Sequence, residues 1–145
     1  MTKPILLEKE DGEVWNVLGE TIVCKLRGDE TFGRFAVVEE TSPPKGVIPP
    51  HFHNQTDEII YVLEGEYEVE CDGQKTIAHS GNMLVIPRGT IHSLKNRLTK
   101  PSRMLAIITP SGFENFFAEI SNLKTAADAR EIVEIGRRND LELVI

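Results

Sequence analysis

Residues 59–78 read IIYVLEGEYEVECDGQKTIA, and this stretch decides the class of fold. Within residues 66–72, acidic and apolar side chains alternate strictly, so one face of an extended strand is charged and the other is apolar. Gly65 lies in a turn before this strand, and Asp72-Gly73 is a hairpin signal that leads into a return strand. The stretch therefore predicts antiparallel β-structure with one face buried.

Short strand-like segments separated by turn signals continue outward on both sides of this stretch. The further strands that we expect lie at 31–38, 83–86, 91–94 and 103–109. The pattern contains no parallel βαβ unit, which favours an all-β sandwich or barrel. At 145 residues the chain suits a single domain, 1–145, and we expect its barrel core over about 15–109.

After residue 109 the pattern changes from strand to helix. Residues 111–114, Ser-Gly-Phe-Glu, match a capping box, and apolar residues that include Phe116 and Phe117 recur at helical spacing. We expect a second helix to begin with Thr125 as its N-cap. The barrel is therefore expected to carry an α-helical C-terminal tail over about 111–145.

Charge and composition exclude several classes of partner. The chain has 16 Lys and Arg against 23 Asp and Glu, a formal net charge of −7, which repels a nucleic-acid backbone. Its apolar runs are far shorter than the roughly 20 residues that span a bilayer, so we expect no membrane partner. The N-terminus shows no signal-peptide core, which favours a cytoplasmic location. Cys24 and Cys71 form no CxxC pair, which disfavours a disulfide scaffold.

Three histidines form the clearest chemical pattern in the chain. His51 and His53 are two residues apart on an extended segment, so both imidazoles can point into one cavity. Glu58 follows after a polar turn, and His92 comes from a later strand. Taken alone, a His-x-His pair in a β protein is more often a packed or surface pair. Three imidazoles and one carboxylate together, however, suit a divalent transition metal.

The residues around these histidines resemble the two motifs of the cupin family. The residues that match the first motif are Gly46, His51, His53, Glu58 and Gly65. The residues that match the second motif, at every fixed spacing, are Gly81, Pro87, Gly89, His92 and Asn96. One spacing departs from the family: four residues separate Gly46 from His51, where cupins usually have five. This departure affects a turn and leaves the spacing of the candidate ligands intact.

The resemblance implies a double-stranded β-helix, the jelly-roll barrel of the cupins. It also implies one divalent transition metal per chain, which could be Mn, Fe, Ni, Co or Zn. The ligands that it implies are His51, His53, Glu58 and His92. Glu58 could serve as a ligand, as the catalytic base, or as both in turn.

Cupins include dioxygenases, isomerases, epimerases, decarboxylases and binding proteins, so the fold alone does not decide the activity. The C-terminal segment is similar to the helix that follows the barrel in single-domain cupins of the quercetin 2,3-dioxygenase type. The leading interpretation is a metal-dependent dioxygenase of quercetinase type that acts on a small aromatic or enol substrate. The alternatives are a metal-dependent isomerase or epimerase with Glu58 as base, and a non-catalytic small-molecule binding or sensor protein.

Aromatic residues supply candidate walls for a substrate pocket. These candidates are Phe35, Tyr67, Phe116 and Phe117. Strand parity can place Phe35 and Tyr67 inside the barrel, and the C-terminal helix could close the pocket over the metal. Simple core packing, or a helix packed on the outside of the barrel, would account for the same residues.

The segment from Ile59 to Leu63 is apolar on both faces of its strand. One face can fill the barrel, while the other needs a cover that a single small barrel lacks. We therefore expect a homodimer in which a second barrel covers this face.

Overall fold

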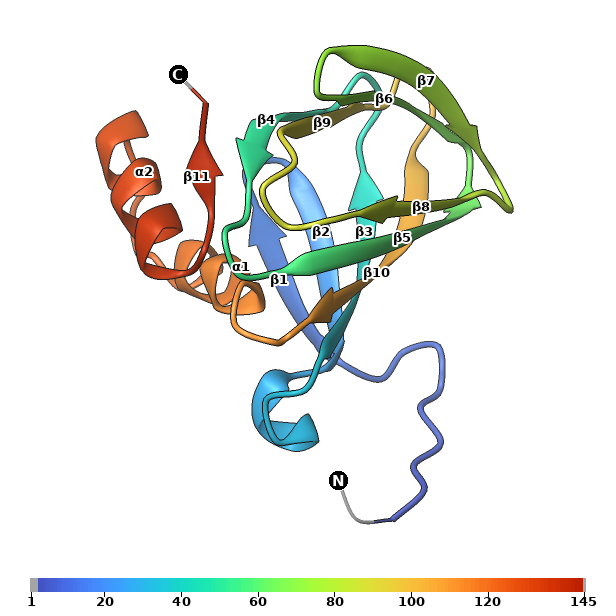
Figure 1. Cartoon of the computed structure of the whole chain (residues 1–145). Coiled ribbons are helices and arrows are strands. Elements are labelled where there is room, and N and C mark those ends of the chain that lie inside the picture. Colours follow the sequence, from blue (N-terminus) through green and yellow to red (C-terminus); the bar gives the residue numbers. More distant parts are fainter. Residues whose placement is uncertain (1–2, 145) are drawn as a thin grey trace.

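In the computed structural model, which describes residues 3–144, two antiparallel sheets face each other and two short helices lie at one side (Figure 1). The six-stranded sheet has the order β1 (Glu13–Val17), β2 (Glu20–Leu26), β3 (Ala36–Ser42), β10 (Ser102–Thr109), β5 (Asp57–Glu64) and β8 (Met83–Ile86). The five-stranded sheet has the order β11 (Glu142–Leu143), β4 (Val47–Phe52), β9 (His92–Lys95), β6 (Glu66–Cys71) and β7 (Gln74–His79). The helices are α1 (Glu114–Ser121) and α2 (Ala129–Arg138). This mostly β arrangement agrees with the expected jelly-roll.

Alternation of side chains across the strands builds the core between the sheets. In β10, every second residue is buried, and β3 and β6 show the same pattern. The largest fully buried apolar side chains are Trp15, Ile22, Ile60, Tyr67, Ile86 and Ile108. Because each strand buries one face, a slip by one residue would expose its whole apolar set, and this fixes the register.

The strand expected at 31–38 is wrong in its first half. Gly28–Thr31 forms a 3-10 helix, and β3 begins only at Ala36. Phe32 and Gly33 between them have φ angles of 56° and 76°, in the left-handed region that a strand does not contain. The apolar pattern identified the strand, but it did not reveal the turn that delays its start.

The C-terminal tail contains the two expected helices, but both begin differently. Ser111 does not cap α1; the carboxylate of Glu114 instead accepts the backbone N–H groups of Gly28 and Gly112. Helix α2 begins after Asp128, not Thr125, because the Asp128 carboxylate accepts the N–H of Glu131 at 2.8 Å.

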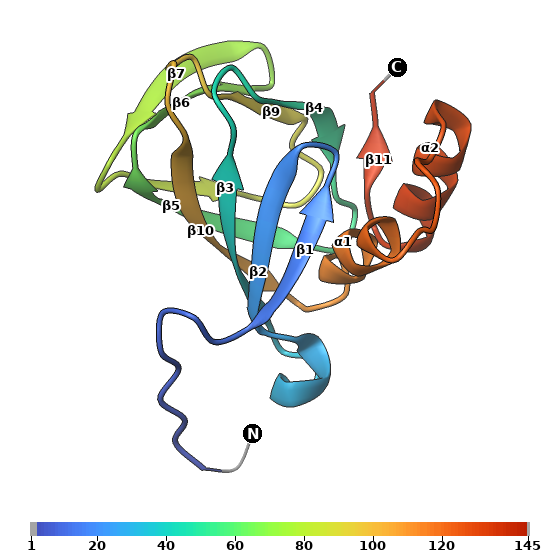
Figure 2. The same cartoon turned by 180° about the vertical axis from the view of Figure 1, so that it is seen from behind.

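The tail is not wholly helical, since it ends in the short strand β11. This strand extends the five-stranded sheet by pairing with β4, where Leu143 lies opposite His51. Figure 2 shows the other side of the tail, where α1 packs against β1 and α2. The tail therefore bridges both sheets at one end.

The outer face of β5 is open, as the apolar pattern of that strand indicates. Ile60 and Val62 are buried, whereas Tyr61 is 39% exposed. Met83 and Val85 on the neighbouring strand β8 are 63% and 60% exposed. We call Tyr61, Met83 and Val85 the outer apolar face; that a second copy covers it stays a prediction. Within residues 3–144, no helix is long and apolar enough to cross a membrane.

Candidate metal centre

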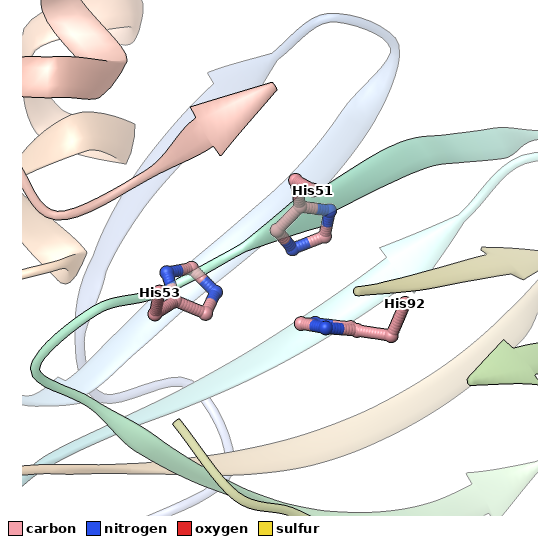
Figure 3. A group of neighbouring side chains, drawn as sticks. All are labelled: His51, His53 and His92. Atoms are coloured by element: carbon pink, nitrogen blue, oxygen red, sulfur yellow. The ribbon is translucent and has the colours of Figure 1, made fainter. Parts of the chain in front are cut away.

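The three expected histidines come together between the sheets (Figure 3). His51 lies in β4 and is paired with His92, the first residue of β9. His53 follows directly after the end of β4. The pairing of β4 with β9 is irregular between Ile48 and His51, where Pro49 and Pro50 have no N–H to donate.

Backbone carbonyls orient all three imidazoles through their Nδ1 atoms. The Nδ1 atoms of His51 and His92 lie 2.8 and 2.9 Å from the carbonyl oxygens of Pro49 and Thr90. His53 Nδ1 lies 2.6 Å from the Asp140 carbonyl oxygen. These bonds place the proton on Nδ1 and leave each Nε2 with a free lone pair.

The free nitrogens are buried and converge on one point. Potential ligand atoms of the three histidines lie within 4.8 Å of one another. The Nε2 atoms of His53 and His92 are buried and have no hydrogen-bond partner among the described residues. A buried polar atom without a partner costs about 1–3 kcal/mol, and coordination of a cation would satisfy both atoms at once. The three-histidine group could therefore hold a metal.

Glu58 reaches the same point from the opposite sheet. Its two carboxylate oxygens lie 3.7 Å from His53 Nε2 and 3.7 Å from His92 Nε2. Two ligands of a single ion lie about 3 to 4.4 Å apart when each is about 2.1–2.2 Å from it. The carboxylate thus stands where a fourth ligand or a base beside the ion would stand.

Burial and charge set the protonation of this group. Burial alone would raise the pKa of Glu58, but the neighbouring His92, His53 and His51 lower it to about 2. Burial, and to a smaller extent the neighbouring His92, lowers the pKa of His51 to about 4. Burial also acts to lower the pKa of His92, but the Glu58 carboxylate raises it above its usual range. At neutral pH the carboxylate is therefore ionised and His51 is a neutral donor, which are the forms that bind a metal.

The other motif residues hold the loops that carry the histidines. Gly89 has a φ of 82° and donates its N–H to the carbonyl of His53 at 2.7 Å, which ties the two motifs together. Asn96 is fully buried, and its side-chain amide donates to the carbonyls of Pro43 and Lys100. These two residues are structural supports of the site.

A cavity of about 260 Å³ opens beside His51 and Glu58. Phe116 and Phe117, two of the four pocket candidates, line this cavity together with Phe113, whose ring centroid lies 4.2 Å from that of the His53 imidazole. The aliphatic lining includes residues from β2, β3 and α2. The cavity is therefore apolar except where it meets the candidate metal centre and two further carboxyl groups.

Phe35 and Tyr67, the other two pocket candidates, do not line this cavity. Phe35 is half-buried just before β3, where strand parity turns it away from the core. Tyr67 is fully buried, and its hydroxyl lies 3.0 Å from both Ser42 Oγ and the Ser102 carbonyl oxygen. Tyr67 thus packs in the core behind the cavity wall.

Asp140, which the sequence did not single out, supports the site most directly. Its carboxylate accepts the N–H groups of Asn54 and Gln55 and the hydroxyl of Thr56, at 2.8, 3.0 and 2.7 Å. Its carbonyl oxygen faces His53, as described above. Asp140 has a φ of 57° in a turn after α2, and the only local signal was Asn139-Asp140 at the end of a helix.

A cupin-domain sequence model matches residues 38–108, which contain all four candidate ligands. The chain belongs to the cupin family. This cupin is 34% identical over 94 residues to a quercetin 2,3-dioxygenase of Bacillus subtilis, a match that covers 63% of the chain and 27% of that enzyme. It is 31% identical over 106 residues to an uncharacterized protein of Aquifex aeolicus, with 73% of this chain and 79% of that protein covered. The first three curated relatives are longer proteins, of which this cupin spans 27% to 41%.

Solved structures show the same fold. KdgF from Halomonas sp. superposes with a TM-score of 0.66 at 23% identity, over 74% of this cupin and 94% of that chain. The polyketide cyclase RemF from Streptomyces resistomycificus superposes with a TM-score of 0.65 at 25% identity, over 77% and 81% of the two chains. The neighbours carry different activities, so the choice among them depends on the site itself.

Proposed function

We propose that this jelly-roll cupin is a metal-dependent dioxygenase of quercetinase type that acts on a small aromatic or enol substrate. One observation carries the proposal: the free Nε2 atoms and the Glu58 carboxylate converge at the wall of an apolar cavity that three phenylalanines line. A cavity of 260 Å³ lies below the range of about 300–1,000 Å³ that is typical of drug-sized ligands, which favours a small substrate.

In this proposal, His51, His53, His92 and Glu58 hold one divalent transition metal. The ion would supply a Lewis acid with open positions for a substrate oxygen and for O2. Phe113, Phe116 and Phe117 exclude water from the cavity and hold an aromatic ring beside the site. Glu58 accepts a proton from the enol or phenolic hydroxyl of the substrate, because it is ionised at neutral pH.

The experiment is elemental analysis of protein purified without added metal, followed by O2 uptake with flavonols and catechols. Glu58→Gln keeps the shape of the side chain and removes its charge. Since three imidazoles still hold the ion, we expect this variant to keep its metal and to lose about 100-fold to 10,000-fold in turnover. Glu70→Gln on β6, which points away from the core, is the control and keeps full activity.

Absence of metal that persists after reconstitution contradicts the proposal. Turnover of Glu58→Gln at the wild-type rate with metal bound shows that Glu58 is not the base. Conversion of substrate without O2 would favour the isomerase or epimerase alternative. Tight binding of ligands that no form of the protein converts would favour the binding protein.

A further inference from the structure

Two glutamates inside the apolar cavity take no part in the candidate metal centre. Glu20 in β2 and Glu40 in β3 both line the cavity and are 8% and 6% exposed. They lie on adjacent strands, where Ile22 pairs with Glu40. A charged residue at the apolar positions of two neighbouring strands is costly unless it is partnered.

Glu20 has a hydrogen-bond donor outside the pair, whereas Glu40 has none among the described residues. The Ser42 hydroxyl donates to Glu20 at 2.5 Å. The polar neighbour of Glu40 is the Glu20 carboxyl, and the two acids share a hydrogen bond. Among the described residues, no donor outside this pair bonds to Glu40. Burial, that bond and the charges of Glu20 and Glu58 all raise the pKa of Glu40 well above its usual range. A buried carboxyl that faces a cavity without a donor is a feature that a ligand can complete.

The pair and Glu58 lie at different levels along β10. Along β10, Glu40 lies beside Met104, whereas Glu58 lies beside Ile108. Four residues of a strand span about 13 Å, at roughly 3.3 Å per residue. A ligand with one end at the histidines can therefore place its other end against Glu20 and Glu40.

The charge of the cavity limits which chemical group a ligand can place against Glu20 and Glu40. Its lining contains Glu20, Glu40 and Glu58, and no Lys or Arg among the described residues. Beside Glu20 and Glu40, a carboxylate or phosphate would meet like charges in an apolar surrounding and find no basic side chain. A hydroxyl group both donates and accepts, which suits two carboxyls that share one proton.

We propose that Glu20 and Glu40 form a recognition site for an uncharged hydroxyl group at the end of the substrate that is remote from the histidines, and that they exclude substrates with a carboxylate or phosphate there. This inference depends on the proposed function in one respect: the substrate must bind in the cavity beside the histidines. It narrows the substrate class to neutral molecules with a hydroxyl at both ends. Glu20 and Glu40 determine specificity, and Glu58 remains the proposed base.

The test measures binding calorimetrically with three biphenyls. The first carries a para-hydroxyl on each ring, the second carries one para-hydroxyl, and the third has a para-carboxylate in place of the second hydroxyl. We expect the wild type to bind the dihydroxy compound about 10-fold to 100-fold tighter than the monohydroxy compound, and the carboxylate most weakly. Glu40→Met should lose the preference for the second hydroxyl and keep its affinity for the monohydroxy compound.

Glu39→Met is the matched control, because Glu39 precedes Glu40 in β3 but lies on the outer face, paired with Arg103. It should keep the wild-type preference. The double variant Glu20→Gln/Glu40→Gln keeps the polar shape and removes the one negative charge that the pair carries, so it should discriminate less against the carboxylate. Circular dichroism establishes that each variant is folded.

Equal affinity of the wild type for the dihydroxy and monohydroxy compounds overturns the inference. So does a preference that survives in folded Glu40→Met, or unchanged discrimination against the carboxylate in Glu20→Gln/Glu40→Gln. Because binding requires no turnover, a protein that never consumes O2 but shows the preference would refute the proposed function alone. A protein that consumes O2 with flavonols but lacks the preference would refute this inference alone.

Discussion

Removal of the Asp140 carboxylate should weaken metal binding without touching a metal ligand. Asp140→Gly is the informative change, because glycine adopts a φ of 57° without strain and keeps the carbonyl that faces His53. The variant loses three hydrogen bonds, from Asn54, Gln55 and Thr56. Asp140 is half-buried, so we assign about 1 kcal/mol to each bond, or about 3 kcal/mol in all.

That free energy holds the loop 53–57 in the conformation that presents His53. A free energy of about 1.4 kcal/mol corresponds to a factor of ten in affinity. Loss of about 3 kcal/mol can therefore weaken metal binding by at most about 100-fold. Residues that orient metal ligands typically contribute about 10-fold to 100-fold to metal affinity, which gives the same range. We therefore expect a dissociation constant for Co²⁺ that is about 10-fold to 100-fold higher than in the wild type.

The assay is titration of metal-free protein with Co²⁺ against a competing chelator, followed by absorption spectroscopy. Asp128→Ala is the matched control: it removes the N-cap of α2 and destabilises the same tail by about 1 kcal/mol without contact to the loop. Equal Co²⁺ affinities in Asp140→Gly and Asp128→Ala would refute the reasoning. They would show that the tail acts on the site only through overall stability.

Three further predictions follow from the site and the sheets. His53→Ala should lose most of the bound metal in elemental analysis while circular dichroism stays unchanged, because the apolar strands carry the fold; an unchanged metal content would place His53 outside the centre. Light scattering at micromolar concentration should give a homodimer that Tyr61→Arg dissociates, and a monomeric wild type would leave the outer apolar face without this partner. The raised pKa of Glu40 means that the folded state holds the proton longer than the unfolded state, so the free energy of unfolding should fall as pH rises above about 4.5, the usual pKa of a glutamate. Denaturation at several pH values should show this slope weakened in Glu40→Gln, and the same slope in both proteins would disprove it.

The histidines could be predicted from the sequence because their geometry is local. His51 and His53 are two residues apart in an extended segment, so the chain itself directs them to one side. Glu58 and His92 could be added because their spacings, and those of the glycines in the turns, match the two cupin motifs. Strand β6 was equally clear, since the alternation of acidic and apolar side chains is a property of neighbouring residues.

The supports of the site could not be predicted, because they are not local. Asp140 contacts residues 53–56, and β11 pairs with β4; Asp140 and Asn54 are 86 residues apart, more than half the length of the chain. No pattern of neighbouring residues contains that pairing. Glu40, in contrast, does have a local signal. It lies two residues after Val38 and four after Ala36 on the same strand, so alternation places its carboxyl on the buried face.

The dependence of His53 on Asp140 imposes an order on biosynthesis. Asp140 lies 48 residues after His92, so the ribosome delivers all three histidines before the group that orients one of them. At about 5–20 residues per second, the interval lasts roughly 2 to 10 s. During it, His53 lacks the carbonyl that fixes its ring, and the nascent chain offers flexible imidazoles that would accept any available cation. Discrimination among metals is therefore expected to be a property of the finished protein, acquired through exchange after synthesis.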